Sequence, residues 1–186
     1  MLISKKKFII KGEEMKFYRT LHPRPVVIIG SGNVKKGEVN FMACSWITPI
    51  AEDIPALGFA CDKEHFTYKL IQKYKEFSVN ITENIDLIWR VGTSSGKDVN
   101  KVETFDIKIK PGKVLEVPLI KDALANLECK VIKEIEVGEV MFYIGEVKHW
   151  EASDFDEYGY KEFWKLPLHK GGKAFTFSNK KLYFPK

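Results

Sequence analysis

The sequence is poor in the residues that build disulfide-stabilised or zinc-binding proteins. Its 186 residues include three cysteines, Cys44, Cys61 and Cys129, at wide spacing. An odd number of distant cysteines defines neither a disulfide framework nor a zinc motif, so we expect a reducing, cytoplasmic environment. The four histidines form no HExxH or other close pair, and we therefore predict no metal site.

Long apolar runs and one-sided charge are also lacking. The apolar run near the start covers only Phe8–Ile10, far too short for a signal segment or a membrane span, so we expect no membrane partner. Lys and Arg number 30 against 25 Asp and Glu, and the net charge of +5 is spread along the chain. This balance permits an anionic small ligand without indicating nucleic acid.

The sequence is rich in strand patterns. Segment 103–110 alternates strictly, with Phe105, Ile107 and Ile109 on one face, and predicts a strand. A long segment with a central turn at Gly138 predicts two antiparallel strands. The expected strands cover 25–32, 37–50, 54–61, 76–82, 103–110 and, as a pair, 127–152.

Helix patterns are few, over 63–74 and 84–92. We therefore predict a mainly β fold, a small antiparallel barrel of residues 17–152 with a few short helices. Residues 1–16 read as an N-terminal extension. Residues 153–186 read as an extended aromatic tail, which either packs on the barrel or a partner subunit or closes as a flap over a flat ligand.

Two glycine-rich segments resemble the sequence motifs of nucleotide-binding loops. Gly30–Asn33 follows a strand, but its third glycine is missing and another strand follows, so we interpret it as a hairpin turn. Gly92–Lys97 has the wrong spacing for a P-loop, although its N–H groups and hydroxyls could still bind phosphate.

Polar residues interrupt apolar segments in three places. Asn40–Thr48 carries amide, hydroxyl and indole groups, whose burial is costly unless each finds a partner, either locally at a barrel corner or on a ligand. Cys61–Leu70 gathers polar groups at a helix start, which favours an anion or simple capping by Asp62. Ser94–Lys101 is a polar loop, either solvated or facing phosphate.

Together these stretches resemble the flavin reductase-like family, the FMN-binding split barrels that include flavoredoxins. The matching segments are HPRPVVIIGSG, VNFMACSWITPIAEDIPALGFACDKEHFTYKLI, KEFSVNIT, SSGKDVNK and GEVKHW, within residues 17–151. The resemblance implies a six-stranded Greek-key split barrel, a homodimer, and FMN near the dimer interface. It implies hydride transfer from NADH or NADPH to flavin, then delivery to free flavin, a ferric complex or a redox partner protein.

The resemblance also assigns roles to residues. Asn40 and Trp46 would line the flavin, the 42–45 backbone would follow the ring edge, and Thr67 would hold the phosphate or ribityl chain. Lys101 matches a family lysine, although Val102 departs from its pattern. The full expected cofactor set is Asn40, Met42, Ala43, Cys44, Ser45, Trp46, Cys61, His65, Thr67, Ser95, Lys101, His149 near the ring, and Trp164 as cover for the second face.

No side chain is expected to act as acid or base, because the flavin performs the redox step. The cysteines are interpreted as apolar filling, with a redox thiol as the less favoured alternative. A pure electron carrier without NAD(P)H use stays open. The rival from another class is a non-enzymatic basic β-barrel that binds single-stranded nucleic acid through its aromatic tail.

Overall fold

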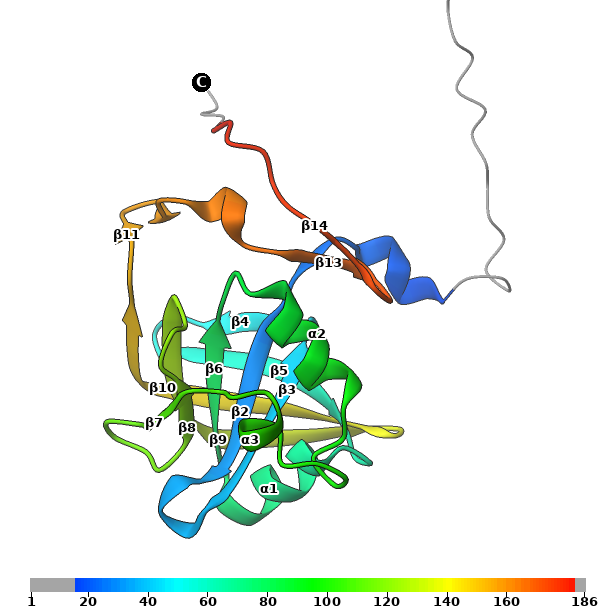
Figure 1. Cartoon of the computed structure of the whole chain (residues 1–186), viewed down its shortest axis with the longest axis vertical. Coiled ribbons are helices and arrows are strands. Elements are labelled where there is room, and N and C mark those ends of the chain that lie inside the picture. The colour runs from blue at the N-terminus through cyan, green and yellow to red at the C-terminus, as the bar shows by residue number, and fades with distance from the viewer. Residues whose placement is uncertain (1–15, 183–186) are drawn as a thin grey trace, which may run out of the picture.

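The computed structural model describes residues 16–182 and is built on one curved antiparallel sheet (Figure 1). Its seven strands lie in the order β3-β2-β6-β9-β10-β5-β4, and every neighbouring pair is antiparallel. The strands are β2 (Val27–Asn33), β3 (Glu38–Cys44), β4 (Ile47–Ala51), β5 (Ala56–Asp62), β6 (Glu76–Ile81), β9 (Ala125–Val137) and β10 (Val140–Ala152). The fold is a mainly β split barrel, with one strand more in this sheet than the six expected.

The split lies between β3 and β4, the two edges of the sheet, which the chain joins through Ser45 and Trp46. The prediction of one continuous strand over 37–50 was therefore wrong. Residues up to Cys44 pair with β2, whereas residues from Ile47 pair with β5 at the opposite edge. Met42 and Cys44 face the barrel interior before the crossing and Ile47 faces it afterwards, so the alternation shifts by one residue at Ser45 and Trp46.

The prediction of a hairpin turn at Gly30–Asn33 was also wrong, because these residues continue β2. The turn comes later, in η2 (Val34–Lys36) followed by Gly37 in the left-handed conformation. Gly30 is required by packing, since a Cβ there would lie 2.6 Å from the carbonyl oxygen of Pro118 and 2.3 Å from Ser78 Oγ. A close backbone approach, and no turn, explains this glycine.

The chain also forms three short helices, α1 (Phe66–Tyr74), α2 (Ile85–Thr93) and α3 (Lys101–Thr104). Ile71 of α1 packs on the interior apolar cluster, whereas Ile88 and Val91 of α2 pack on a second cluster. Helix α1 begins later than predicted, with His65 as its N-cap residue, while Asp62 ends β5 and accepts a hydrogen bond from Glu64 N. The predicted strand over 103–110 was wrong. Asn100 caps α3 through the N–H of Val102, and the chain then turns with Asp106 at φ +49°.

The apparent alternation at 103–110 has a physical cause. Phe105 and Ile107 both pack on one apolar cluster although the chain between them is a turn. Only Ile109–Pro111 is extended, as β7, paired with β8 (Pro118–Ile120). A loop, and not a strand, therefore buries these alternate side chains.

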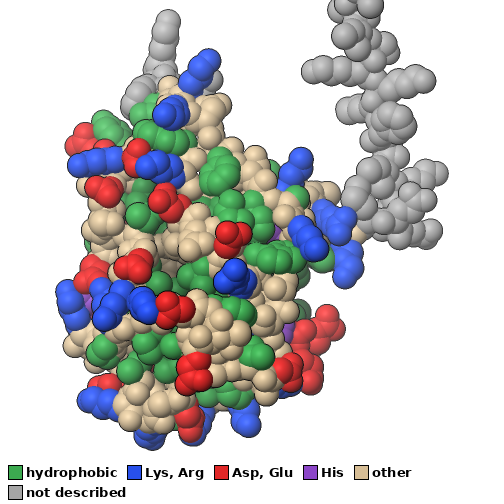
Figure 2. Space-filling view, viewed as in Figure 1, with side chains coloured by type: hydrophobic (Ala, Val, Ile, Leu, Met, Phe, Trp, Pro, Cys, Tyr) green, Lys and Arg blue, Asp and Glu red, His purple; other side chains and the backbone are tan. Residues whose placement is uncertain are grey.

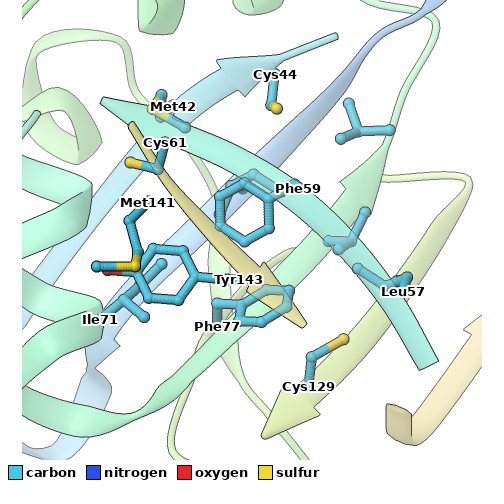
Figure 3. Close-up of a cluster of buried hydrophobic side chains, with 13 residues drawn as sticks. Met42, Cys44, Leu57, Phe59, Cys61, Ile71, Phe77, Cys129, Met141 and Tyr143 are labelled. Atoms are coloured by element: carbon cyan, nitrogen blue, oxygen red, sulfur yellow. The ribbon is translucent and has the colours of Figure 1, made fainter. Parts of the chain in front are cut away.

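The barrel interior holds the larger of two apolar clusters (Figure 3). Phe59, Phe77 and Tyr143 form its aromatic centre, with ring centroids 4.9 Å and 5.6 Å from Phe59. The three cysteines are buried in this cluster. The second cluster lies outside the barrel and joins β2 and β3 to α2, through Ile28, Phe41, Ile88 and Val91 among others.

The predicted tail, residues 153–186, is described to residue 182 and is more ordered than an extended segment. It contains the pair β11 (Phe155–Asp156) and β12 (Gly159–Tyr160), then η3 (Phe163–Lys165), then the hairpin of β13 (Leu168–Gly171) and β14 (Ala174–Thr176). β13 pairs with β1 (Arg24–Pro25), which follows η1 (Phe17–Leu21), so the tail returns to the start of the described chain (Figure 1).

Most of the predicted extension 1–16 lies outside the described residues. Within 16–182, no helix combines the length and apolar character needed to cross a bilayer. Lysines, arginines and carboxylates are interspersed on the face in Figure 2, without a basic stripe.

Candidate functional site

The edge strand β3 carries the central feature of the site. The carbonyl of Phe41 points away from β2, since it accepts a hydrogen bond from the Lys101 ammonium at 2.8 Å. Residues two apart on a strand point their N–H and C=O groups to the same side, so those of Ala43 also face outward. Two cavities, of about 220 and 380 Å³, lie here, and Ala43 and Ser45 line both.

The smaller cavity lies between β3, α2 and the tail hairpin. Trp89 and Gly92 of α2 line it, together with His169 and Phe175 of the tail. Ser45 Oγ and His169 Nδ1 are 3.2 Å apart, and His169 Nε2 lies 3.2 Å from the carbonyl of Gly172. Burial lowers the pKa of His169. The tail therefore forms one wall of the site.

The larger cavity lies beside Trp46, whose side chain is 41% exposed. Tyr18 meets this indole edge-on with ring centroids 5.3 Å apart, and the Arg24 guanidinium lies 5.6 Å from the indole centroid. Met42 and Cys44 also line this cavity, as expected for the 42–45 segment. An exposed indole beside an unpaired strand edge suits a flat ligand with a polar rim.

Asn40 and Thr67 form a buried polar pair close to β3. Asn40 Nδ2 donates to Thr67 Oγ1 at 2.9 Å, and Asn40 Oδ1 is buried without a partner among the described residues. Gly96 packs on this pair, since a Cβ there would lie 2.2 Å from Asn40 Oδ1. Asn40, which was expected to line the flavin, and Thr67, which was expected to hold the phosphate or ribityl chain, are thus brought together, and the Asn40 Oδ1 acceptor is left unsatisfied.

The start of α1 and the 94–100 loop lie beside that pair. His65 is exposed and lines the larger cavity. Ser95 is exposed, and its Oγ accepts a hydrogen bond from Lys97 N at 3.1 Å. Lys97 lies 3.7 Å from Glu64, which links the loop to the residues before the helix. Hydroxyls, a lysine and helical N–H groups are therefore available to an anion.

Lys101 occupies a different environment from the one expected. Its side chain is only 4% exposed, and its ammonium donates to the carbonyls of Phe41 at 2.8 Å and Val91 at 2.7 Å. Burial lowers the pKa of Lys101 to about 8. The ammonium joins β3 to the end of α2, and both donated bonds stay within the protein.

The cysteine side chains point into the core (Figure 3). Burial raises the pKa of Cys44 and of Cys61 to about 12, and it also raises the pKa of Cys129. These thiols are protonated at neutral pH, which favours the interpretation as apolar filling. Cys61 lines neither cavity, and Cys44 reaches the larger one from the edge strand.

His149 and Trp164 lie away from both cavities within this chain. His149 lies opposite Glu128 on the neighbouring strand β9. Val140, the residue of β10 that lines the larger cavity, is nine residues away from His149 along the strand. Trp164 packs on Phe163 and lies under the Lys180 ammonium, 4.8 Å from the indole centroid. The tail rings at the site are His169 and Phe175 instead.

Four residues at the site were not expected from the sequence: His22, Arg24, His169 and Phe175. They come together because β1 pairs with β13, a contact between chain segments about 145 residues apart. The one available signal was that a histidine lies beside a proline in two distant segments, HPRP and PLHKGG. Among residues 16–182, no group of three or more His, Cys, Asp and Glu side chains could hold a metal ion.

The chain is thus a split barrel with an open strand edge between two cavities. The chain matches the flavin reductase like domain over residues 18–165 and belongs to that family. An uncharacterized protein of Archaeoglobus fulgidus is 31% identical over 180 residues, which cover 95% of this chain and all of that protein.

Solved structures share the fold at lower identity. An FMN-binding protein from Thermus thermophilus superposes with a TM-score of 0.84 at 22% identity, covering 97% of this chain and 99% of that one. Flavoredoxin from Methanosarcina acetivorans gives a TM-score of 0.80 at 24% identity, covering 96% and 95% of the two chains.

Proposed function

We propose that this protein is an FMN-binding oxidoreductase. The observation that carries the proposal is the outward-facing edge of β3 at Ala43, flanked by two cavities and followed by the exposed indole of Trp46. Flavin rings present N–H and carbonyl groups along one side, which an open strand edge can match. Family membership and the FMN-binding protein with the same fold support this assignment.

The residues present fit FMN. Ala43 and Ser45 would hold the polar rim of the ring, Trp46 would contact its apolar part, and the Asn40–Thr67 pair would bind the ribityl–phosphate chain. The unsatisfied Asn40 Oδ1 would receive a hydroxyl donor there. Ser95, Lys97 and the start of α1 would add donors for the phosphate.

Bound flavin would supply hydride acceptance from NADH or NADPH and onward electron transfer. The protein residues would bind and orient the flavin, and the tail hairpin forms one wall of the smaller cavity. The family name favours a flavin reductase. A ferric-chelate reductase of Archaeoglobus fulgidus that is 25% identical over 132 residues favours ferric complexes as a further acceptor. Flavoredoxin-like electron carriage, in which a partner protein reduces the flavin, is the second candidate, because a flavoredoxin shares the fold over 96% of this chain.

The first prediction concerns colour and its loss. The purified protein should be yellow, or become so on adding FMN, and the absorbance should bleach without air when NADH or NADPH is added. A yellow protein whose flavin is reduced by a partner protein, but by neither NADH nor NADPH, supports the electron-carrier function. A protein that cannot be loaded with FMN and shifts single-stranded nucleic acid with steep salt dependence contradicts the proposal.

We also propose that the protein is a homodimer through the outer face of β4, β5, β10 and β9. Phe59, Cys61, Met141 and Tyr143 point inward, so the residues between them point outward. Phe142 lies opposite Ala60 and Ile135 on its two neighbours, and it packs with Ile50 over Gly58. Ile50, Ile135 and Val137 are exposed, the last at 65%. Exposed apolar patches of this kind typically mark protein contacts.

The second prediction is that Ile135→Lys converts the dimer to a monomer, since a buried unpaired charge at the interface is strongly unfavourable. Sedimentation or light scattering at micromolar concentration measures the mass. Val114→Lys, at an exposed apolar position in a loop, serves as the matched control and should remain dimeric. A wild-type protein that is monomeric throughout contradicts the proposal.

A further inference from the structure

A cluster of cationic and imidazole groups lies where the tail meets the start of the described chain. Arg24 of β1 stands directly opposite His169 of β13. The rings of His22 and His169 are 5.3 Å apart, and an Arg24 Nη lies 2.8 Å from His22 Nε2. The cluster reaches the larger cavity through Trp46, on whose indole the Arg24 guanidinium rests.

The hydrogen positions in this cluster follow from chemistry. A guanidinium can only donate, so His22 Nε2 must accept the bond from Arg24. A neutral imidazole that accepts at Nε2 carries its proton on Nδ1. His22 Nδ1 is buried and has no partner among the described residues, and the same holds for Arg24 Nε. Two buried N–H donors therefore lack an acceptor, which is rare in folded proteins.

The positive charge of Arg24 is equally uncompensated. The ion pairs found within residues 16–182 are all made by lysines, so Arg24 has no carboxylate at ion-pair distance there. His169 does not serve as its acceptor, since its nitrogens face Ser45 and Gly172. A partly buried cation with an unpaired, buried N–H donor is suited to an anion.

The residues around Arg24 indicate which other groups a ligand would contain. Tyr18 and Trp46 place aromatic surface beside Arg24, and Lys16 lines the same cavity. The carboxylates of Asp62 and Glu139 line this cavity as well. Asp62 ends β5 and Glu139 lies in the β9–β10 turn, and among the described residues neither carboxylate is at ion-pair distance from Arg24. A planar ligand with one oxyanion would therefore direct that oxyanion towards Arg24.

We propose that Arg24, with His22, forms an oxyanion subsite for the molecule that exchanges electrons with the flavin. The inference rests on the proposed function and adds the substrate class: a planar molecule carrying a carboxylate or phosphate. The two sources of the oxyanion are the diphosphate of a nicotinamide nucleotide and the carboxylate of an organic acceptor. The pairing of β13 with β1 holds the subsite together, which gives the tail a role in substrate binding.

The test compares benzoate with benzamide, a neutral molecule of nearly the same shape, by calorimetric titration of the FMN-loaded protein. Benzoate should bind at least about tenfold more tightly, because only the carboxylate forms an ion pair with Arg24, whereas the benzamide carbonyl is a neutral acceptor. Arg24→Gln should abolish this difference. Arg90→Gln, the same change on α2, should preserve it. If Arg24→Gln does not fold, Arg24→Lys retains the charge but loses the Nε–H donor, and should bind benzoate more weakly than the wild type.

Equal binding of benzoate and benzamide, or an unchanged preference in the Arg24 variants, would overturn the subsite. Loading with FMN is measured first and without turnover. Failure to bind FMN therefore contradicts the proposed function, while an FMN-loaded protein indifferent to benzoate contradicts this inference alone. A raised KM for NADH alone in Arg24→Gln assigns the oxyanion to the nucleotide, and a raised KM for a carboxylate-bearing acceptor alone assigns it to the acceptor.

Discussion

Replacing Lys101 by methionine should lower the free energy of unfolding of the FMN-free protein by about 2–4 kcal/mol. The change removes the donor for the carbonyls of Phe41 and Val91, which become buried acceptors without a partner. Part of this loss of stability is offset, because the variant no longer buries a charged ammonium group. Urea unfolding followed by circular dichroism measures the effect. Lys97→Met, at an exposed position in the loop that precedes α3, should change stability by less than about 0.5 kcal/mol.

The pH dependence gives a second readout. The pKa of Lys101 is lowered to about 8 in the folded protein, against 10.5 for an ordinary lysine. Between these values the unfolded chain holds more protons, so the stability that Lys101 contributes rises with pH. The difference between wild type and Lys101→Met should therefore grow from pH 8 to pH 10. Unchanged stability of the FMN-free variant, with loss of FMN affinity alone, would show instead that Lys101 binds the phosphate directly.

The case of Lys101 shows what a sequence can and cannot say about this site. A lysine between a polar loop and an apolar segment has the same sequence pattern whether it faces phosphate or main-chain carbonyls. Asn40, Thr67, Ser45 and Trp46 were predictable because they interrupt apolar segments, where burial demands a partner. Those four lie at or beside the open strand edge.

The residues that sequence reasoning missed depend on long-range pairing. His169 reaches Ser45 only because β13 pairs with β1, and no local pattern determines which strand a two-residue β1 will accept. The same limitation explains the misplaced strand at 103–110. Local alternation reports which side chains are buried, whereas the sheet topology decides whether a strand or a turn buries them.

Asn40→Ala and Thr67→Ala should each weaken FMN binding by about 1–3 kcal/mol, through loss of hydrogen bonds in a buried site. Gly96→Ala should weaken it as well, since its Cβ would lie 2.2 Å from Asn40 Oδ1 and 2.7 Å from the Phe66 ring. The three changes act on one packed unit, so the double variant of Asn40 and Thr67 should lose less than the sum of the single losses. Quenching of FMN fluorescence during titration measures each affinity.

Two control variants distinguish a specific loss of FMN affinity from a general loss of folding or stability. Asn33→Ala removes an amide from the far end of the same hairpin, where it caps η2 through Lys36 N. Thr48→Ala removes an exposed hydroxyl from β4. Both controls should bind FMN as the wild type does. If Asn40→Ala and Thr67→Ala also retain wild-type affinity, the ribityl–phosphate chain lies elsewhere on the β3 edge, and the unsatisfied Asn40 Oδ1 needs another explanation.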